Sequence, residues 1–227
     1  DNKKPEDILI DFAKSENILF CDNQENEYAE IKLNGHTEVY RIGSTKYNSW
    51  LRQKYYYQTK SAPSKASLDT AVSTIKAIAS FEGDKRDVYL RVAQVGNSMY
   101  IDLCNDSWQV VEVDIKGWRV LDKSPVCFTR TGNMRPLPIP VEGGDISLLL
   151  KHINIEKKDL PLAVGWLLMS LQAGPGAYPV MILNGSAGTG KTTASRMLRE
   201  LVDPNKVDLL TKPSIGDMRV IGVNNHV

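Results

Sequence analysis

The sequence predicts a protein in two parts: an α+β region of helices and an antiparallel β meander, then the first part of an α/β region. Up to about residue 83, apolar residues recur mainly at helical spacing, and from Asp87 the period falls to about 2, which is typical of strands. A proline-rich segment at residues 135–140 precedes the second region, where helical stretches alternate with short apolar runs. The 227 residues, 42% hydrophobic and 24% charged, have the composition of a folded protein.

The first elements are predicted to be a helix and a hairpin. Proline suits the first turn of a helix, which we expect to run from Pro5 to about Ser15. Two strands are expected at Tyr28–Leu33 and Thr37–Ile42. Asn34-Gly35 between them is the strongest short signal for a hairpin turn.

Two amphipathic helices should follow the hairpin. Ser44 or Thr45 can cap the first of them, whose apolar residues share one face: Tyr47, Trp50, Leu51 and Tyr55. The second begins after a break at residues 61–64 and ends by Gly83. Its apolar face carries Leu68, Ala71, Val72, Ile75, Ile78 and Ala79 at near-ideal helical spacing.

Short strands are predicted from Asp87 to Leu121. In the first of them the apolar residues Val88, Leu90 and Val92 alternate with Tyr89 and Arg91. The turns of the meander are expected at residues 96–97, 105–106 and 116–117. The proline-rich segment that follows should be a rigid, extended linker, which divides the chain into domains 1–140 and 141–227.

The second region should begin with helices at residues 145–152 and 158–172. The latter is apolar almost all round, as expected for a helix buried against a sheet. The short apolar run Val180–Leu183 predicts a buried parallel strand, and Thr192–Leu201 predicts the helix after it. Further along, a candidate strand and a candidate helix lie at Val207–Leu210 and Ser214–Val223.

The stretch between the predicted strand and helix matches the phosphate-binding P-loop pattern G-x4-G-K-[ST]. Its fixed positions are Gly185, Gly190, Lys191 and Thr192. Glycines at 185, 188 and 190 permit backbone angles that let successive N–H groups turn inward around an anion. Lys191 would contact the β- and γ-phosphates, and the Thr192 hydroxyl would coordinate Mg²⁺. The same residues would also suit a plain glycine-rich turn with an exposed lysine.

ATP with Mg²⁺ is therefore the expected cofactor, and a P-loop NTPase is the expected fold of the second region. Lys191 and Thr192 are the predicted catalytic residues, and Thr192 is also the predicted metal ligand. The residues predicted to bind the nucleotide are Gly185, Ser186, Ala187, Gly188, Thr189, Gly190, Lys191, Thr192 and Thr193.

Composition limits the other functions. A formal net charge of +1 gives no global field that attracts nucleic acid, so any DNA contact must come from a local basic surface or a ring of subunits. The three cysteines are far apart, which argues against a disulfide framework or zinc site and suits a reducing cytoplasm. The longest apolar run, residues 160–171, is too short to span a bilayer, and there is no signal peptide. Because the chain has no initial methionine, we expect it to be a piece of a longer protein.

The run from Arg52 to Lys60 interleaves cations with tyrosines. This pattern suits single-stranded DNA, because bases stack on aromatic rings and phosphates pair with cations. The candidate DNA-binding residues are Arg52, Lys54, Tyr56 and Lys60. A helix with an apolar face and solvated lysines would have the same sequence, since Tyr55 falls on the apolar face.

Several other polar and aromatic residues have simple structural interpretations. Trp108 and Trp118 are expected to pack in the sheet rather than to stack on bases. Arg130 and Arg135 could contact DNA or a neighbouring subunit, although exposed cations near a loop need no functional explanation. The histidines are isolated from one another, so none is expected to bind a metal: His36, His152 and His226.

With these residues placed, the chain resembles the ATP-binding proteins of bacterial phages and integrated mobile elements, which are related to the MCM-like and superfamily-3 helicases of the AAA+ class. The resemblance covers most of the chain from about residue 28, and the P-loop is its specific part. It is carried by Trp50-Leu51 with Tyr55-Tyr-Tyr57, Val88-Tyr-Leu-Arg-Val92, Tyr100-Ile-Asp-Leu103 with Trp108, Gly117-Trp118-Arg-Val120, Phe128-Thr-Arg130 with Met134-Arg-Pro-Leu-Pro138, and Gly188-Thr-Gly-Lys-Thr192.

The resemblance implies an AAA+-like ATPase domain and an ATP-driven DNA helicase or translocase. Such a protein would work as a homo-oligomeric ring, a hexamer, on single-stranded DNA during replication of a phage or mobile element. Its location would be the cytoplasm of a bacterial cell or phage-infected host. The Walker-A residues map onto Gly188, Gly190, Lys191 and Thr192, and the Walker-B acidic pair is expected beyond Val227. We therefore expect this chain to bind nucleotide but to hydrolyse it poorly.

Two other functions fit the same residues. A small-molecule or nucleoside kinase shares the P-loop, but such enzymes usually carry it close to the N-terminus, whereas here it begins at Gly185. The other is a non-catalytic module, in which residues 1–140 bind DNA or a partner and nucleotide binding only orders the rest.

Overall fold

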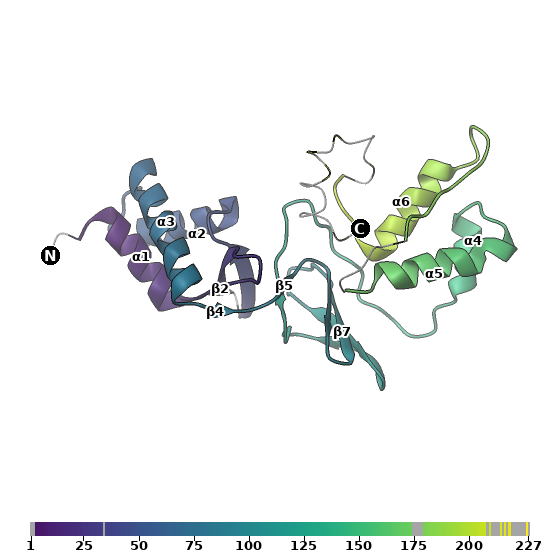
Figure 1. Ribbon diagram of the computed structural model, residues 1–227, viewed down its shortest axis with the longest axis horizontal. Coiled ribbons are helices and arrows are strands. Elements are labelled where there is room, and N and C mark those ends of the chain that lie inside the picture. The colour runs from purple at the N-terminus through teal and green to yellow at the C-terminus, as the bar shows by residue number, and fades with distance from the viewer. Residues whose placement is uncertain are drawn as a thin grey trace. The chain divides into compact units, whose positions relative to one another are not determined.

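A computed structural model describes residues 3–33, 35–173 and 179–207, together with residues 209, 214, 216, 218 and 226. The chain divides into two compact units, and each is described by itself (Figure 1). The first unit comprises Asp1–Tyr89 and Pro125–Thr129, and the second comprises Leu90–Ser124 and Arg130–Val227. The chain mixes helices with antiparallel strands, so the predicted α+β class is confirmed. The functional boundary at residues 140/141 stays a prediction.

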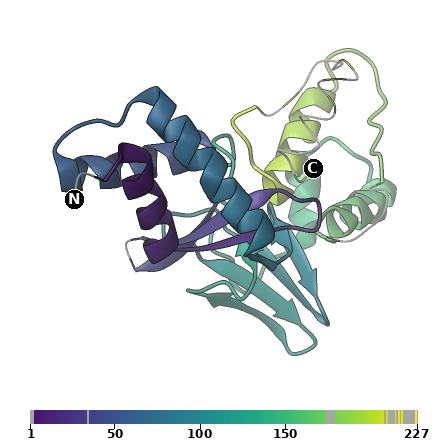
Figure 2. The ribbon, with the colours of Figure 1, turned by 60° about the vertical axis from the view of Figure 1, so that its left-hand side comes forward.

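In the described residues of the first unit, helices pack against a four-stranded sheet. The helices are α1 (Pro5–Glu16), α2 (Thr45–Thr59) and α3 (Lys65–Phe81). The strands lie in the order β3 (His36–Arg41), β2 (Glu27–Leu33), β1 (Asn17–Cys21) and β4 (Asp84–Lys85). The pairs are antiparallel except for β1 with β4. Figure 2 shows α1 and α3 side by side on the sheet.

The helices of the first unit form where the sequence predicts them. The Ser44 side chain accepts a hydrogen bond from the Tyr47 N–H (3.3 Å), and so caps the start of α2. Ser64 caps α3 in the same way. The core contains the predicted face of α2 and four of the six residues predicted for α3: Tyr47, Trp50, Leu51, Tyr55, Leu68, Ala71, Ile75 and Ala79. Val72 packs partly buried against this core, and Ile78 is not part of it. Both hairpin strands are also confirmed, while Asn34 of the predicted turn lies outside the described residues.

Gly83 follows α3 at a point where the backbone is crowded. A Cβ atom at this position would lie 2.4 Å from the Ala79 carbonyl oxygen, 2.7 Å from the Leu19 carbonyl oxygen and 2.9 Å from the Phe20 Cα. Gly83→Ala is therefore expected to lower the free energy of unfolding by about 1–3 kcal/mol, as overpacking does. Urea unfolding followed by circular dichroism measures the loss. Gly144→Ala, whose Cβ would meet nothing within 4 Å, is the control, and equal losses in both variants would contradict the steric reason.

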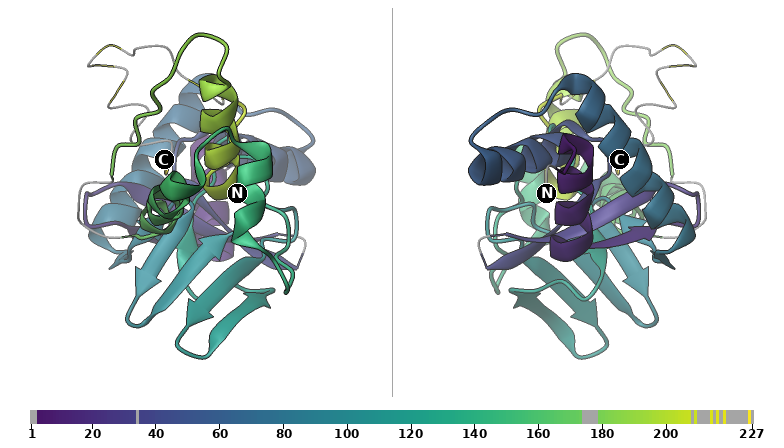
Figure 3. Two further views of the ribbon diagram at one scale, coloured as in Figure 1. Left: turned by 90° about the vertical axis from the view of Figure 1, so that its right-hand side faces the viewer. Right: turned by 90° about the vertical axis from the view of Figure 1, so that its left-hand side faces the viewer.

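The second unit contains the predicted antiparallel meander (Figure 3). Its strands follow chain order: β6 (Val92–Val95), β7 (Ser98–Asp102), β8 (Val110–Asp114) and β9 (Gly117–Leu121). The prediction that the first strand of the meander includes Val88 and Tyr89 is wrong. Val88–Tyr89 forms β5, which pairs in parallel with β10 (Cys127–Phe128) inside the first unit. Arg91, which alternates with apolar neighbours in the sequence, is fully buried.

The helices predicted before the glycine-rich loop are present in the second unit. They are α4 (Leu149–His152) and α5 (Leu160–Ser170), each preceded by a 3₁₀ turn, and α6 (Lys191–Val202) follows the loop. The prediction that the apolar helix α5 is buried all round is wrong. Leu162, Leu168 and Met169 are exposed, because none of the described residues covers that face. No helix in this part of the chain, or elsewhere among the described residues, has the length and apolarity to cross a membrane.

The strand predicted at Val180–Leu183 is also wrong. Met181 and Leu183 pack against the core formed by α5 and α6, while Val180 and Ile182 are 86% and 83% exposed. A strand needs a neighbour that exchanges backbone hydrogen bonds with it, and no described segment supplies one. The described residues therefore do not form the sheet of the predicted P-loop NTPase domain. Val207–Leu210 and Ser214–Val223 lie largely outside the described residues.

The proline-rich segment is extended, but it is fixed to the rest of the second unit. The Arg135 N–H donates to the Pro204 carbonyl (2.9 Å), and the Leu137 N–H donates to the Leu103 carbonyl (2.9 Å). The Arg135 guanidinium also pairs with Glu200 of α6. The segment is therefore extended, as predicted, but it is a strap bonded to the second unit at Leu103, Glu200 and Pro204.

Candidate functional site

The glycine-rich loop leads directly into α6. Gly188 and Gly190 have φ angles of +79° and +80°, in the left-handed region where a Cβ atom is strained. Gly190 is the N-cap, and its carbonyl accepts the first hydrogen bond of the helix from the Ala194 N–H (2.9 Å). The N–H groups of residues 191–193 therefore have no acceptor within the helix. Together with the partial positive charge at the start of α6, they favour an anion at this point.

Lys191 lies across the loop that precedes it. Its Nζ donates hydrogen bonds to the carbonyl oxygens of Gly185 (2.8 Å) and Ser186 (2.6 Å). These acceptors are neutral, and hydrogen bonds between an ammonium group and an anionic oxygen are about twice as strong. An anionic ligand in the loop would therefore compete successfully for the ammonium group of Lys191.

Gly185 leaves space for a neighbouring side chain and does not have a positive φ. The glycines at 185, 188 and 190 were all expected to permit special backbone angles, but positive φ angles are found at Gly188 and Gly190 and not at Gly185. A Cβ atom at position 185 would lie 2.9 Å from the Thr189 Oγ1. That hydroxyl donates to the Ser186 carbonyl (3.0 Å). Thr189 thus closes the loop across the position that Gly185 leaves open.

Two asparagines, which the sequence did not single out, form hydrogen bonds that support the loop. The Asn154 Nδ2 donates to the Thr189 carbonyl (3.1 Å), and the Asn184 Oδ1 accepts the Gly185 N–H (2.9 Å). Asn154 comes from the segment between α4 and α5, and no spacing in the sequence connects it with the loop. Asn184 directly precedes the motif, so its role could have been predicted from its position next to Gly185 in the sequence.

The site offers a metal ion few ligands of its own. Thr192 and Thr193 are exposed in the first turn of α6. Among the residues that the structure describes, no group of three or more His, Cys, Asp and Glu side chains could hold a metal ion. The Thr192 hydroxyl therefore fits as a single ligand for Mg²⁺, whose remaining ligands would be phosphate oxygens and water.

A buried ion pair fixes the other end of α6. The Arg91 Nε donates to the Asp203 Oδ1 at 3.0 Å, and the two side chains are 0% and 1% exposed. The same guanidinium donates to the carbonyl oxygens of Asp102 (3.1 Å), Arg135 (3.0 Å) and Pro204 (3.3 Å). Arg91 therefore joins the meander and the proline-rich strap to the end of the helix that carries the loop at its start.

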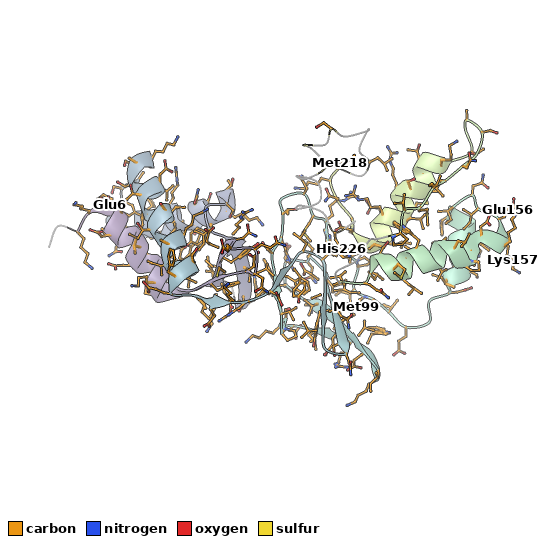
Figure 4. All side chains as sticks on the ribbon, in the orientation of Figure 1. Glu6, Met99, Glu156, Lys157, Met218 and His226 are labelled. Carbon is orange, nitrogen blue, oxygen red and sulfur yellow. The ribbon has the colours of Figure 1, made fainter. Side chains whose placement is uncertain are left out.

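His226 completes this buried cluster (Figure 4). Its N–H donates to the Asp203 Oδ2 (2.9 Å), and its ring Nε2 lies 2.7 Å from the Ser170 carbonyl at the end of α5. Burial lowers the pKa of His226 below its ordinary value, so the ring is neutral at pH 7 and Nε2 is the donor. Asp203 thus receives hydrogen bonds from both Arg91 and His226.

Arg130 forms a second buried pair, which corrects the expectation of an exposed cation. Its Nε and one terminal nitrogen donate to the two carboxylate oxygens of Asp102 (2.8 and 2.5 Å), and the side chains are 7% and 1% exposed. Its other terminal nitrogen donates to the Asn105 carbonyl (2.6 Å). The guanidinium also lies 3.7 Å from the centre of the Trp108 ring. Trp108 therefore packs within the unit.

The candidate DNA-binding residues of α2 lie in two environments. Arg52, Tyr56 and Lys60 are exposed. Lys54 instead pairs with Glu16 of α1 at 2.5 Å, and its Nζ lies 5.8 Å from the centre of the Trp50 ring. The charge of Lys54 is therefore already compensated within the first unit.

The left-handed glycines, the N–H groups that have no acceptor within α6 and the lysine of the loop are features that favour an anion such as phosphate at a helix N-terminus. No protein-family model, curated protein or solved structure was found to match this chain. Its class is therefore inferred from the site itself.

Proposed function

We propose that this chain binds the phosphates of ATP in the loop at residues 185–192, as part of an ATP-dependent DNA helicase or translocase. The observation that carries the proposal is Lys191, held across a loop whose two left-handed glycines lead into a helix N-terminus. The loop supports the nucleotide part of the proposal. The resemblance to the helicases of phages and mobile elements supports the DNA part.

Each residue of the loop has a distinct role in this proposal. The backbone N–H groups that follow Gly188 and Gly190 bind the phosphate oxygens, and Lys191 exchanges the two carbonyls for the β- and γ-phosphates. The Thr192 hydroxyl holds Mg²⁺, which supplies charge neutralisation, and Thr193 adds a further contact. No carboxylate lies between Asp159 and Glu200 in the sequence, so hydrolysis by these residues alone is expected to be slow.

Lys191→Ala is expected to weaken binding of a fluorescent ATP analogue, in the presence of Mg²⁺, by about tenfold to a hundredfold. The reason is that a hydrogen bond to a charged group contributes about 1.5–3 kcal/mol. A fluorescence titration of the 227-residue chain measures the affinity. Lys157→Ala removes an exposed lysine of the same unit and is the matched control (Figure 4). If both variants bind the analogue as the parent does, the loop is a plain glycine-rich turn.

The DNA part of the proposal is tested on the proposed helicase as a whole, and not on this chain alone, through its ATPase activity with and without single-stranded DNA. We expect DNA to stimulate hydrolysis and Lys191→Ala to abolish it. If DNA does not change the rate of hydrolysis and phosphate is transferred to a small molecule, the protein is a kinase. This result would exclude the helicase. ATP binding without turnover in either condition would favour the non-catalytic module.

A further inference from the structure

We propose that the exposed face of α2 binds single-stranded DNA, with bases stacked on Tyr56 and Tyr57 and phosphates paired with Arg52 and Lys60. The inference deepens the proposed function, on which it rests for the choice of DNA as the nucleic acid. It concerns the first unit alone and requires no contact with the nucleotide loop.

The helix presents these residues on the side opposite its core. Residues 52, 56 and 60 are four apart and therefore follow one another along one face. Tyr56 and Tyr57 are 53% and 62% exposed, although the neighbouring Tyr55 is buried in the core. Their rings lie 6.3 Å apart and are tilted by 57°, so each presents a separate surface. Two adjacent aromatic rings in solvent form a platform that bases of any sequence can stack on.

The stretch of sequence that contains the two tyrosines carries charges of one sign. Between Glu38 and Asp69 the sequence has six cationic residues and no carboxylate: Arg41, Lys46, Arg52, Lys54, Lys60 and Lys65. An ordinary solvated surface mixes both signs, whereas this stretch is cationic throughout although the formal net charge of the chain is only +1; of its cations, Lys54 is compensated by Glu16 of α1. This concentration of charge complements a phosphate backbone.

The end of α2 fixes a cation beside the tyrosines. Lys60 is the C-cap in the left-handed conformation (φ 56°), and its N–H donates to the Tyr56 carbonyl at 2.8 Å. The preceding Thr59 hydroxyl donates to the Tyr55 carbonyl (2.9 Å). These bonds hold the turn so that the Lys60 Nζ lies 6.0 Å from the centre of the Tyr57 ring. A base stacked on Tyr57 would therefore have a cation within reach of its own phosphate.

The test measures binding of a fluorescein-labelled oligothymidylate of about 15 nucleotides to the 227-residue chain by fluorescence anisotropy. The double variant Tyr56→Ala/Tyr57→Ala should bind about thirtyfold more weakly or worse, since stacking on each of the two rings contributes about 1–3 kcal/mol. Tyr56→Phe/Tyr57→Phe keeps both rings and should bind as the parent does. Phe81→Ala removes an exposed ring from α3 and should also leave the affinity unchanged.

The cations are tested through the salt dependence of the same binding. Arg52→Gln and Lys60→Gln should each reduce the slope of log affinity against log salt concentration by about 0.7, the value for one phosphate of a single strand. Lys14→Gln removes an exposed cation of α1 and should leave the slope unchanged.

Two results would overturn the proposal. One is equal affinity of the parent and the alanine variant for the oligonucleotide, or no binding by either. The other is competition by polyglutamate of the same charge as strong as that by unlabelled oligonucleotide, which would assign the surface to an acidic protein. Lys191→Ala should bind the oligonucleotide as the parent does, so a failure of the nucleotide site and a failure of this surface are distinguishable.

Discussion

Replacing Arg91 with methionine is expected to lower the free energy of unfolding of the second unit by about 3–5 kcal/mol, the usual cost of removing one partner from a buried ion pair. The Asp203 carboxylate, 1% exposed, would lose the guanidinium that compensates its charge. The carbonyl oxygens of Asp102, Arg135 and Pro204 would lose a donor at the same time. Methionine is long enough to fill much of the space, so the loss measures mainly the charge and the hydrogen bonds.

Urea unfolding followed by tryptophan fluorescence can measure this loss in a Trp50→Phe background. Trp50 is the tryptophan of the first unit, so the signal then comes from Trp108, Trp118 and Trp166 of the second. Arg119→Met is the matched control, because Arg119 pairs with two carboxylates of the meander while remaining largely exposed. The assigned role of Arg91 would be wrong if its variant were as stable as the Arg119 variant.

A second substitution separates charge from hydrogen bonding at this site. In Arg91→Met/Asp203→Leu the buried carboxylate that has lost its guanidinium is removed as well, so part of the stability should return. The recovery should be incomplete, since the three carbonyl oxygens still lack the donor. Because Arg91 and Asp203 are in contact, the losses of the two single variants should not add.

The elements that could be predicted from the sequence are those fixed by nearby residues. Ser44 and the apolar positions of α2 determine where that helix begins and which face it buries, and both lie within a few turns. The left-handed angles at Gly188 and Gly190 likewise follow from a local motif. The strand β1 was missed because it follows α1 without a turn residue and its burial does not alternate.

The features that could not be predicted depend on residues far apart in the chain. Arg91 and Asp203 are separated by 112 positions, and the alternation around Arg91 placed it opposite its apolar neighbours. Parallel strands also require distant partners, so the apolar character of Val180–Leu183 could not decide whether a strand forms. Asn154 joins the loop through a single side-chain hydrogen bond, which leaves no pattern in the sequence.

The exposed fraction of each side chain shows which candidate residues of α2 are available to a ligand, and composition does not contain this information. Arg52 and Lys54 are equally cationic in the sequence, but Lys54 is paired with Glu16 while Arg52 is exposed. Tyr55 and Tyr57 differ in the same manner, since one is in the core and the other is in solvent. Helical periodicity contains this distinction, because only Tyr55 falls on the face of Trp50 and Leu51.

The second large effect is expected at Arg130. Arg130→Met would leave the Asp102 carboxylate, which is 1% exposed, with the Cys104 N–H as its remaining hydrogen-bond donor in the described residues. We expect the free energy of unfolding to fall by about 3–5 kcal/mol, measured by the same urea titration. Some of the loss would come from the guanidinium stacked on Trp108, which also reports the change directly through its fluorescence.

Arg130→Lys distinguishes the geometry of the pair from its charge. Lysine keeps the positive charge, but it cannot donate to both carboxylate oxygens at once in the planar arrangement of a guanidinium, nor reach the Asn105 carbonyl in the same conformation. The free energy of unfolding of Arg130→Lys should therefore lie between those of the parent and of Arg130→Met. A lysine variant as stable as the parent would mean that charge alone holds Asp102. A methionine variant as stable as the parent would mean that the pair is replaceable by packing, as happens for some buried ion pairs.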